Sequence, residues 1–209
     1  MTATPQKHLL FVVSAPSGAG KTSLCIEAVN RLQAIRFSVS HTTRPVRSGE
    51  EHGKNYFFVS PAEFEALLQQ NKIAEWTEIY GNRYGTAKQT IAEAFAGGYD
   101  LLFDIDERGG RQLTDTYDDV ATILVVPPSL AELRRRLSGR GTEDEHSLRR
   151  RLMRAKEEMA QMRWYKYIIV NDRFEDAVEQ LMAIITAERC RRDHGIVEEL
   201  LNEDDLCKG

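Results

Sequence analysis

The stretch Ala15-Pro16-Ser17-Gly18-Ala19-Gly20-Lys21-Thr22 follows the apolar run Leu9–Val13 and precedes a helical pattern of apolar residues. A strand, a glycine-containing turn and a helix in this order bring several backbone N–H groups to one anion, and the helix dipole adds about half a positive charge. Lys21 supplies a full charge for the β- and γ-phosphates, and the hydroxyl of Thr22 is a ligand for Mg²⁺. The stretch therefore predicts a loop that binds the phosphates of ATP.

The first position of this loop motif is normally glycine, and here it is Ala15. The methyl group of alanine excludes a strongly positive φ, so the loop is expected to keep its shape only with a negative φ at Ala15. The simpler alternative is a glycine-rich turn that only connects a strand to a helix. The strand, the lysine, the hydroxyl and the helix are all in register, which favours the phosphate loop.

Four continuous apolar runs alternate with helical patterns along the chain. Because their apolar residues do not alternate with polar ones, the runs are typical of strands buried on both faces of a parallel sheet. They are Leu9–Val13, Leu101–Ile105, Thr122–Val126 and Tyr167–Val170. Strands alternating with helices predict an α/β core.

Several helix ends are marked in the sequence. Gly97-Gly98 is expected to end a helix that begins near Thr86. Capping-box spacing marks four helix starts. The pairs are Ser60 with Glu63, Ser129 with Glu132, Thr142 with Glu145, and Asp172 with Glu175.

Composition excludes several classes of protein. The chain has 209 residues and a net charge of -4, which argues against a nucleic-acid partner. Its longest apolar run is far shorter than the ~20 residues that span a bilayer, so no membrane partner is expected. The three cysteines lack metal-like spacing and indicate free thiols in a reducing compartment. Together these features predict a cytoplasmic location.

Two segments interrupt the strand–helix alternation, and the first suggests an acceptor site. It carries Arg44 and Arg47, with Tyr56 a few residues later. Two guanidinium groups and a phenol suit a dianionic phosphate. The second segment runs from about Ser129 to Arg163 and is rich in arginine. Both are expected to move against the core.

The order of these motifs resembles the guanylate kinase family, from the first strand to about Arg189. The resemblance implies a P-loop kinase core with a five-stranded parallel sheet flanked by helices, a mixed α/β GMP-binding insertion and a small helical lid. It implies transfer of the γ-phosphoryl group of ATP to GMP, and to dGMP, with Mg²⁺. The corresponding division is 1–36, 89–128 and 164–209 for the core, 37–88 for the insertion and 129–163 for the lid.

The resemblance also implies roles for individual residues. Arg44, Arg47, Tyr56 and Tyr84 correspond to residues that hold the GMP phosphate, and Ser40, Glu75, Thr86 and Asp106 to residues that read guanine. Arg136, Arg140 and Arg151 correspond to lid arginines that contact phosphate, Arg140 and Asn171 to contacts with ATP. Thr22 is the expected direct metal ligand, with Asp104 acting directly or through water.

The chemistry of guanine agrees with these roles. Its N1–H and 2-amino groups are donors that the carboxylates of Glu75 and Asp106 can accept, while adenine lacks the amino group. Ser40 and Thr86 can donate to O6. Transfer needs no general base, because the GMP phosphate is already an anionic nucleophile at neutral pH. The neighbouring arginines Arg134, Arg135, Arg149 and Arg154 are expected to be solvated surface charges.

Some features depart from the family motif, and alternatives stay open. Glu107-Arg108-Gly109-Gly110 replaces the usual apolar residue and glutamine before glycine, and the usual proline has moved to Pro45. One alternative is another nucleoside monophosphate or phosphosugar kinase on the same scaffold. Another is a non-catalytic binding module. Ile196, Val197, Leu200 and Leu201 could dock on the core or on a second copy, so a homo-oligomer is an open expectation.

Overall fold

The computed structural model describes residues 8–138 and 145–191. Its centre is a five-stranded sheet in the order β2-β7-β1-β8-β9, in which every neighbouring pair is parallel. The strands are β1 (Leu10–Ser14), β2 (Ile35–Phe37), β7 (Asp100–Asp104), β8 (Val120–Val126) and β9 (Tyr167–Val170). The predicted α/β core with a parallel sheet is confirmed. Strand β2 was not among the four predicted runs, because three residues around Arg36 are too few to make a pattern.

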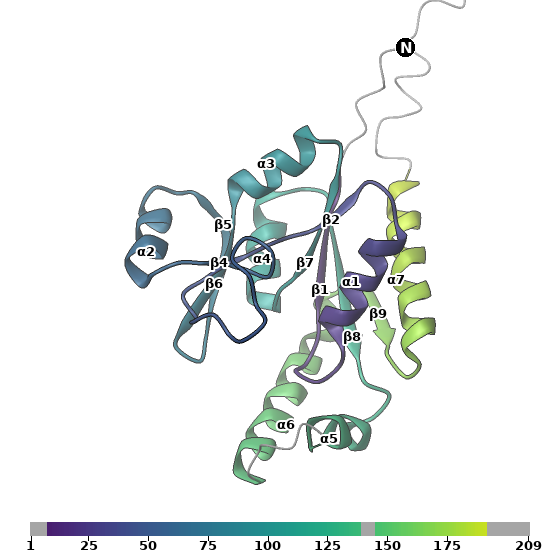
Figure 1. The fold of residues 1–209 in the computed structure, drawn as a ribbon. Coiled ribbons are helices and arrows are strands. Elements are labelled where there is room, and N and C mark those ends of the chain that lie inside the picture. Colours follow the sequence, from purple (N-terminus) through teal and green to yellow (C-terminus); the bar gives the residue numbers. More distant parts are fainter. Residues whose placement is uncertain (1–7, 139–144, 192–209) are drawn as a thin grey trace, which may run out of the picture.

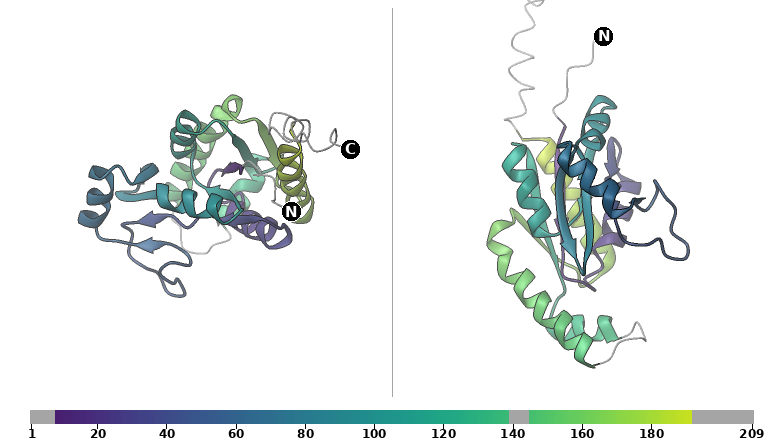
Figure 2. Two further views of the ribbon diagram at one scale, coloured as in Figure 1. Left: turned by 90° about the horizontal axis from the view of Figure 1, so that it is seen from above. Right: turned by 90° about the vertical axis from the view of Figure 1, so that its left-hand side faces the viewer.

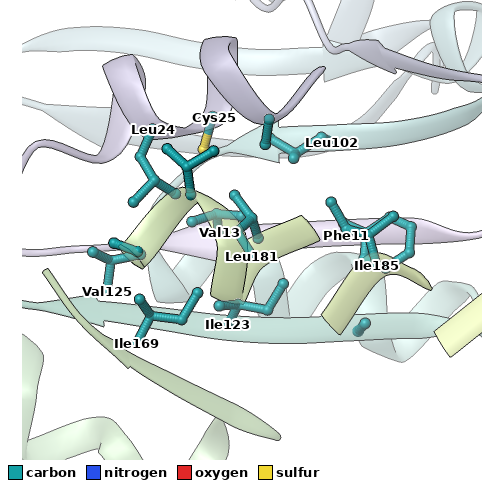
Figure 3. Packing of buried hydrophobic residues seen from close by; sticks show 14 of the residues in the cluster. Phe11, Val13, Leu24, Cys25, Leu102, Ile123, Val125, Ile169, Leu181 and Ile185 are labelled. Atoms are coloured by element: carbon teal, nitrogen blue, oxygen red, sulfur yellow. The ribbon is translucent and has the colours of Figure 1, made fainter. Parts of the chain in front are cut away.

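Four helices cover the two faces of this sheet (Figure 1). They are α1 (Lys21–Arg31), α3 (Lys88–Ala96), α4 (Glu107–Thr116) and α7 (Phe174–Arg189). Alternate residues of β1 point to opposite faces. Phe11 and Val13 pack with α1 and α7, as Figure 3 shows, whereas Leu10 and Val12 pack with α3 and α4. Each fully buried side chain of this size contributes about 1.5–3 kcal/mol, so the central strand is a rigid support for the loop that follows it.

A second, four-stranded sheet lies beside the core and carries helix α2 (Pro61–Gln69) (Figure 1). Its order is β4-β3-β6-β5, with β3 and β4 parallel and the other pairs antiparallel. The strands are β3 (His41–Thr42), β4 (Phe57–Phe58), β5 (Ile73–Ile79) and β6 (Asn82–Ala87). This part has the mixed α/β character expected of the insertion.

Helices α5 (Leu130–Ser138) and α6 (Glu145–Ala160) project beyond the end of the sheet at which β1 leads into the loop (Figures 1 and 2). A small apolar cluster of Leu133, Leu137, Leu148 and Ala155 holds them together. A short 3₁₀ helix, η1 (Gln161–Trp164), returns the chain to β9. The expected lid thus has a core of its own. The limits predicted for the three parts of the chain stay a prediction.

The helix caps confirm part of the sequence interpretation. Ser60 and Glu63 form a full capping box at α2, and Ser129 accepts a hydrogen bond of 3.0 Å from the backbone N–H of Glu132. Gly97 caps α3 and Gly98 follows with a φ of 79°. The cap predicted at Thr142 lies outside the described residues.

The cap predicted at Asp172 is wrong. Helix α7 begins one residue later than expected, with Arg173 at the N-cap and no side-chain hydrogen bond there. None of the described helices combines the length and apolar character needed to cross a membrane.

Candidate active site

The loop between β1 and α1 has the backbone that its sequence predicts. Gly18 and Gly20 adopt φ values of 91° and 87°, which L-residues with a side chain rarely adopt. Ala15 is absent from the residues with positive φ, and its methyl group packs against the core. The expectation for Ala15 is confirmed, so this alanine places no strain on the loop.

Three groups meet at the start of α1 and the end of β7. Lys21 Nζ lies 2.5 Å from Asp104 Oδ1 and donates to the carbonyl of Ile105 at 3.2 Å. Thr22 Oγ1 donates to Asp104 Oδ2 at 2.5 Å. Burial lowers the pKa of Lys21, but the charge and hydrogen bond of Asp104 outweigh burial and leave the pKa above its ordinary value. The lysine is therefore cationic throughout the physiological range.

Asn171 forms a hydrogen bond with the backbone of the loop. Its side-chain amide donates to the carbonyl of Ala19 at 2.7 Å, and only 4% of the residue is exposed. A side chain at Gly20 would come within 2.8 Å of this amide. Asn171 also accepts from Arg136 through its backbone carbonyl, at 3.0 Å. The side chain of Asn171 thus holds the loop backbone. The predicted contact with adenine stays a prediction.

A cleft with a volume of about 460 Å³ joins the loop to the second sheet. Its walls come from the loop, from the ends of β7, from β5 and β6, and from α6. Of the predicted residues it contains Ala15, Pro16, Ser17, Gly18, Gly20, Lys21, Thr22, Ser40, Arg47, Tyr56, Glu75, Tyr84, Asp104, Asp106 and Arg151. Predicted residues that are described but do not line it are Ala19, Arg44, Thr86, Arg136 and Asn171.

The second sheet contributes hydroxyl groups to this cleft. Ser40 Oγ and Thr86 Oγ1 lie 3.2 Å apart. Thr86 does not line the cleft itself but forms a hydrogen bond with Ser40, which does. The rings of Tyr56 and Tyr84 meet edge to face at 5.9 Å. Burial raises the pKa of Tyr56, which keeps its phenol protonated as a donor. These groups suit a polar ligand.

Glu75 is the least satisfied charged group of the site. The residue is 1% exposed, and neither carboxylate oxygen has a hydrogen-bond partner among the described residues. Burial raises its pKa to about 7, and the charge of Asp106 adds to the rise; Thr86 opposes it without reaching hydrogen-bond geometry. A buried polar group without a partner costs about 1–3 kcal/mol or more, so the pocket favours a ligand that donates to it.

Asp106 has a structural role in addition to its place in the cleft. It is the N-cap of α4, where Oδ1 accepts from the backbone N–H of Gly109 at 3.1 Å. Oδ2 accepts from Thr77 at 3.2 Å and from Arg108 at 2.8 Å and 3.1 Å. The capping role was not predicted, although Asp at a strand–helix junction is a common signal for it.

Arg44 is held away from the cleft by an ion pair. Its two terminal nitrogens contact Glu50 at 2.7 Å and 3.0 Å, and the Arg47 backbone N–H donates to the same carboxylate at 2.8 Å. The guanidinium lies 5.4 Å from the ring centre of Tyr56. A phosphate at this place would have to displace or share Glu50.

Among the described residues, helix α6 contributes two arginines to the cleft, Arg151, which was predicted, and Arg154, which was not. Arg151 donates to Ser17 of the loop at 2.9 Å. Arg154, predicted to be a solvated charge, lines the cleft, pairs with Glu158 at 2.8 Å and lies 5.4 Å from the ring centre of Tyr80. The prediction that Arg154 is a solvated charge is wrong. Arg151 and Arg154 lie about one turn apart on α6, so both are on the helix face that lines the cleft.

Arg136 and Arg140 differ from Arg151 in what the structure describes. Arg136 pairs with Glu132 at 2.7 Å and donates to the Asn171 carbonyl. Arg140 lies outside the described residues. The predicted phosphate contacts of both arginines stay predictions.

Two residues of the cleft, Thr77 and Ile79, were not predicted although the sequence carries a signal for them. Thr77 and Ile79 line the cleft together with Glu75. Alternate residues of a strand point to the same face, so the assignment of Glu75 to a pocket already implied that Thr77 and Ile79 follow it. Tyr80 and Glu158 also line the cleft, and only the tertiary structure brings them there.

The family model for guanylate kinase matches residues 7–188 of the chain. The chain belongs to the guanylate kinase family. A guanylate kinase of Geobacter metallireducens is 48% identical over 186 residues, which cover 89% of this chain and 92% of the relative. One of Novosphingobium aromaticivorans is 44% identical over 191 residues, covering 91% and 86%. The crystal structure of guanylate kinase from Anaplasma phagocytophilum superposes with a TM-score of 0.78 at 30% identity, covering 95% of this chain and 96% of that one.

Membership of the guanylate kinase family confirms the interpretation made from the sequence. It also confirms the fold class, since the solved guanylate kinase and this chain share the five-stranded core over nearly their whole length. Neither of the two alternatives, a different small-molecule kinase or a binding module, gains support. The roles of individual residues are a separate matter and rest on the geometry of the cleft.

Proposed function

We propose that the chain transfers the γ-phosphoryl group of ATP to GMP, giving ADP and GDP. The observation that carries the proposal is the buried carboxylate of Glu75, which accepts no hydrogen bond from the described residues and lies in the same cleft as Lys21 and the phosphate loop. A carboxylate in this state favours a base that presents N–H donors, which guanine does at N1 and at its 2-amino group. Adenine would instead direct the lone pair of its N1 at the carboxylate.

The donor nucleotide binds at the loop. The backbone N–H groups beside Gly18 and Gly20 surround its phosphates, and Lys21 neutralises the charge between the β- and γ-phosphates. Arg151 adds a second cation from the lid, next to Ser17. Positive charge fixed around a transferring phosphoryl group accelerates its transfer, and an arginine alone is worth about 10³–10⁵ in related enzymes.

The residues at the loop fit a magnesium ion. Thr22 Oγ1 and the Asp104 carboxylate are oxygen ligands of the type that Mg²⁺ prefers, and they already lie within 2.5 Å of each other. Among the described residues no group of three His, Cys, Asp or Glu side chains is arranged for a metal. Phosphate oxygens and water would complete the coordination. The ion, when bound, offsets negative charge on the phosphates.

The acceptor binds on the opposite side of the cleft. Arg44, Arg47, Tyr56 and Tyr84 hold its phosphate, with Arg44 exchanging Glu50 for the ligand. Glu75 and Asp106 accept from the base, and Ser40 and Thr86 donate to O6. The phosphate of GMP is itself the nucleophile, so alignment and charge neutralisation are the whole of the catalytic task.

The division into core, insertion and lid is part of the proposal. Separate apolar clusters support it, since the helices of the expected lid pack on each other through Leu133 and Leu148. We also propose a cytoplasmic enzyme, in keeping with free thiols at the buried Cys25 and the exposed Cys190.

A nucleotide-panel assay tests the proposed function. Steady-state rates with ATP and Mg²⁺ would be measured for GMP, dGMP, AMP, UMP, dTMP and ribose 1,5-bisphosphate. We expect GMP to have the highest kcat/KM, followed by dGMP, and AMP to be lower by about 10²-fold or more. A higher kcat/KM for AMP or dTMP would overturn the assignment of Glu75. Peptide binding without any ATP turnover in a folded sample would favour the binding module.

A further inference from the structure

Two side chains of helix α4 form hydrogen bonds with the backbone of strand β5. Gln112 donates to the carbonyl of Trp76 at 2.8 Å and accepts from its N–H at 3.0 Å. Arg108 donates through Nη2 to the carbonyl of Glu78 at 3.2 Å. The strand that carries Glu75 is therefore fixed to a helix of the core at two points on either side of Thr77.

Asp106 contacts Thr77, which lies between these two points on β5. Its two carboxylate oxygens accept different numbers of hydrogen bonds. Oδ2 accepts three hydrogen bonds, two from Arg108 and one from Thr77. Oδ1 accepts one, from the N–H of Gly109. Because each carboxylate oxygen offers about two lone-pair sites, Oδ2 is saturated and Oδ1 retains one site.

The pocket therefore presents unoccupied acceptor sites to a ligand. Both oxygens of Glu75 are without a partner in the described part of the chain, and Oδ1 of Asp106 adds one site. Guanine offers three N–H donors on one edge, one at N1 and two at the 2-amino group. By the same count the two oxygens of Glu75 offer about four sites, so acceptors suffice for every donor of the base. Arg108 determines which oxygen of Asp106 stays open, since it makes two of the three hydrogen bonds on Oδ2.

We propose that Arg108 is a positioning residue that determines specificity for the guanine base, because it fixes the Asp106 carboxylate against β5 and leaves Oδ1 for the ligand. The inference rests on the proposed function. Arg108 acts through Asp106 and does not line the cleft itself. It belongs to the stretch Glu107-Arg108-Gly109-Gly110, in which this chain departs from the family motif.

The charge of Arg108 has a second effect on the pocket. Burial raises the pKa of Glu75, and the nearby charge of Asp106 adds to that rise. The guanidinium of Arg108, 2.8 Å from Asp106, offsets part of that negative charge. Without it, the two carboxylates that face the ligand would have less positive charge beside them. The base would bind more weakly, whereas the phosphate loop would be unaffected.

The test compares three variants of the full-length enzyme in steady-state assays. Arg108→Met removes the charge and the donors but keeps the length of the side chain. Arg108→Lys keeps the charge and a donor. Arg111→Gln is the matched control, because Arg111 lies one turn along the same helix and pairs with Glu107 and Trp164 instead of the pocket. Thermal unfolding of each variant checks that it is folded.

For Arg108→Met we expect KM for GMP to rise about tenfold, with kcat and KM for ATP within about threefold of wild type. The preference for GMP over AMP should fall by a similar factor. Arg108→Lys should recover most of the loss, and Arg111→Gln should match wild type. If Arg108→Met unfolds, Arg108→Gln replaces it with the same expectations.

Two results would overturn the inference. One is an unchanged KM for GMP in the Arg108 variants while wild type phosphorylates GMP; the proposed function would then stand. The other is an equal loss in kcat, KM for GMP and KM for ATP, which is the pattern of a general structural defect. Failure of wild type itself to phosphorylate GMP would overturn the proposed function and the inference together.

Discussion

The two ends of the cleft are built in different ways. At the loop, the charged and polar groups satisfy one another: Lys21 and Thr22 both bind Asp104, and Asn171 binds the loop backbone. At the opposite end, Glu75 is buried, and neither carboxylate oxygen has a hydrogen-bond partner in residues 8–138 and 145–191. At the first end, the contacts of Lys21 and Thr22 with Asp104 keep these side chains in place, and a nucleotide must replace them. The second end carries a desolvated carboxylate, whose cost is relieved by a proton or by a ligand that donates to it.

The difference separates binding of the donor from recognition of the acceptor. Backbone geometry and a rigid strand form the donor end, so its affinity depends on a few charges. The acceptor end depends on the match between side-chain acceptors and base donors. Substitutions at the two ends should therefore affect different kinetic constants.

The largest effect is expected for Lys21→Ala. Loss of the charge between the β- and γ-phosphates should lower kcat by about 10³-fold or more, because this charge acts on the transferring group. GMP binding, measured by isothermal titration, should stay close to wild type. Lys88→Ala is the control, since Lys88 binds Asn71 on the surface away from the cleft. Loss of GMP binding in Lys21→Ala would show that the two ends are not separate.

Glu75→Gln tests the acceptor end directly. The amide accepts through one oxygen where the carboxylate accepts through two, and its NH₂ group opposes a base donor. We expect KM for GMP to rise about 10²-fold with a smaller change in kcat, and discrimination against AMP to fall. Glu78→Gln, on the same strand but outside the cleft, should match wild type. An unchanged KM would remove Glu75 from the recognition of guanine.

Arg44→Ala should raise KM for GMP by about 10- to 100-fold, because it removes a bidentate phosphate contact. KM for ATP should stay within about twofold. Arg83→Ala is a suitable comparison, since Arg83 on β6 pairs with Glu65 of α2 and does not line the cleft. A selective loss of ATP affinity in Arg44→Ala would contradict the assignment of this arginine to the acceptor.

The pH dependence follows from Glu75, whose pKa of about 7 lies above the ordinary value of 4.5. Guanine requires the ionised form, so KM for GMP should fall about tenfold from pH 6 to pH 8. The phosphate of GMP also titrates near pH 6. The Glu75→Gln variant corrects for that contribution, because it retains the phosphate effect alone. Identical profiles for the two proteins would argue against titration of Glu75.

The same shift predicts a change in stability without ligand. Between pH 4.5 and pH 7 the folded protein keeps a proton on Glu75 that the unfolded chain has lost, so the free energy of unfolding falls as pH rises. The difference is on the order of 3 kcal/mol across this window. Thermal unfolding of wild type should therefore lose more stability than Glu75→Gln between pH 5 and pH 7. Parallel curves would contradict the shift.

The smallest effect is expected for Ala15→Gly. Ala15 has no positive φ and packs against the core, so glycine should leave kcat within about twofold of wild type. The free energy of unfolding should fall by about 0.4–1 kcal/mol, because glycine increases the entropy of the unfolded chain. A gain in kcat would show that the methyl group restrains the loop.

The sequence by itself determined the core and the donor site. Leu9–Val13, the loop and α1 are contiguous, so local patterns carry the whole unit and the structure has it as expected. Continuous apolar runs identified four of the five core strands, and capping signals located the start of α2. Glu75, Arg47, Tyr56 and Tyr84, which the family resemblance assigned to the acceptor, line one cleft with the loop, and their roles stay predictions.

Only the tertiary structure decided which groups pair with which. Local patterns say nothing of the contact of Arg44 with Glu50, and long-range packing brings Asp106 to Thr77 and Arg154 to the cleft. Whether a charged side chain is free or paired depends on neighbours far along the chain, because hydrogen bonds and ion pairs act over a few ångströms of space. For that reason the sequence identified the phosphate loop, whereas the burial of Glu75 and the hydrogen bond of Thr77 to Asp106 became visible only in the folded chain.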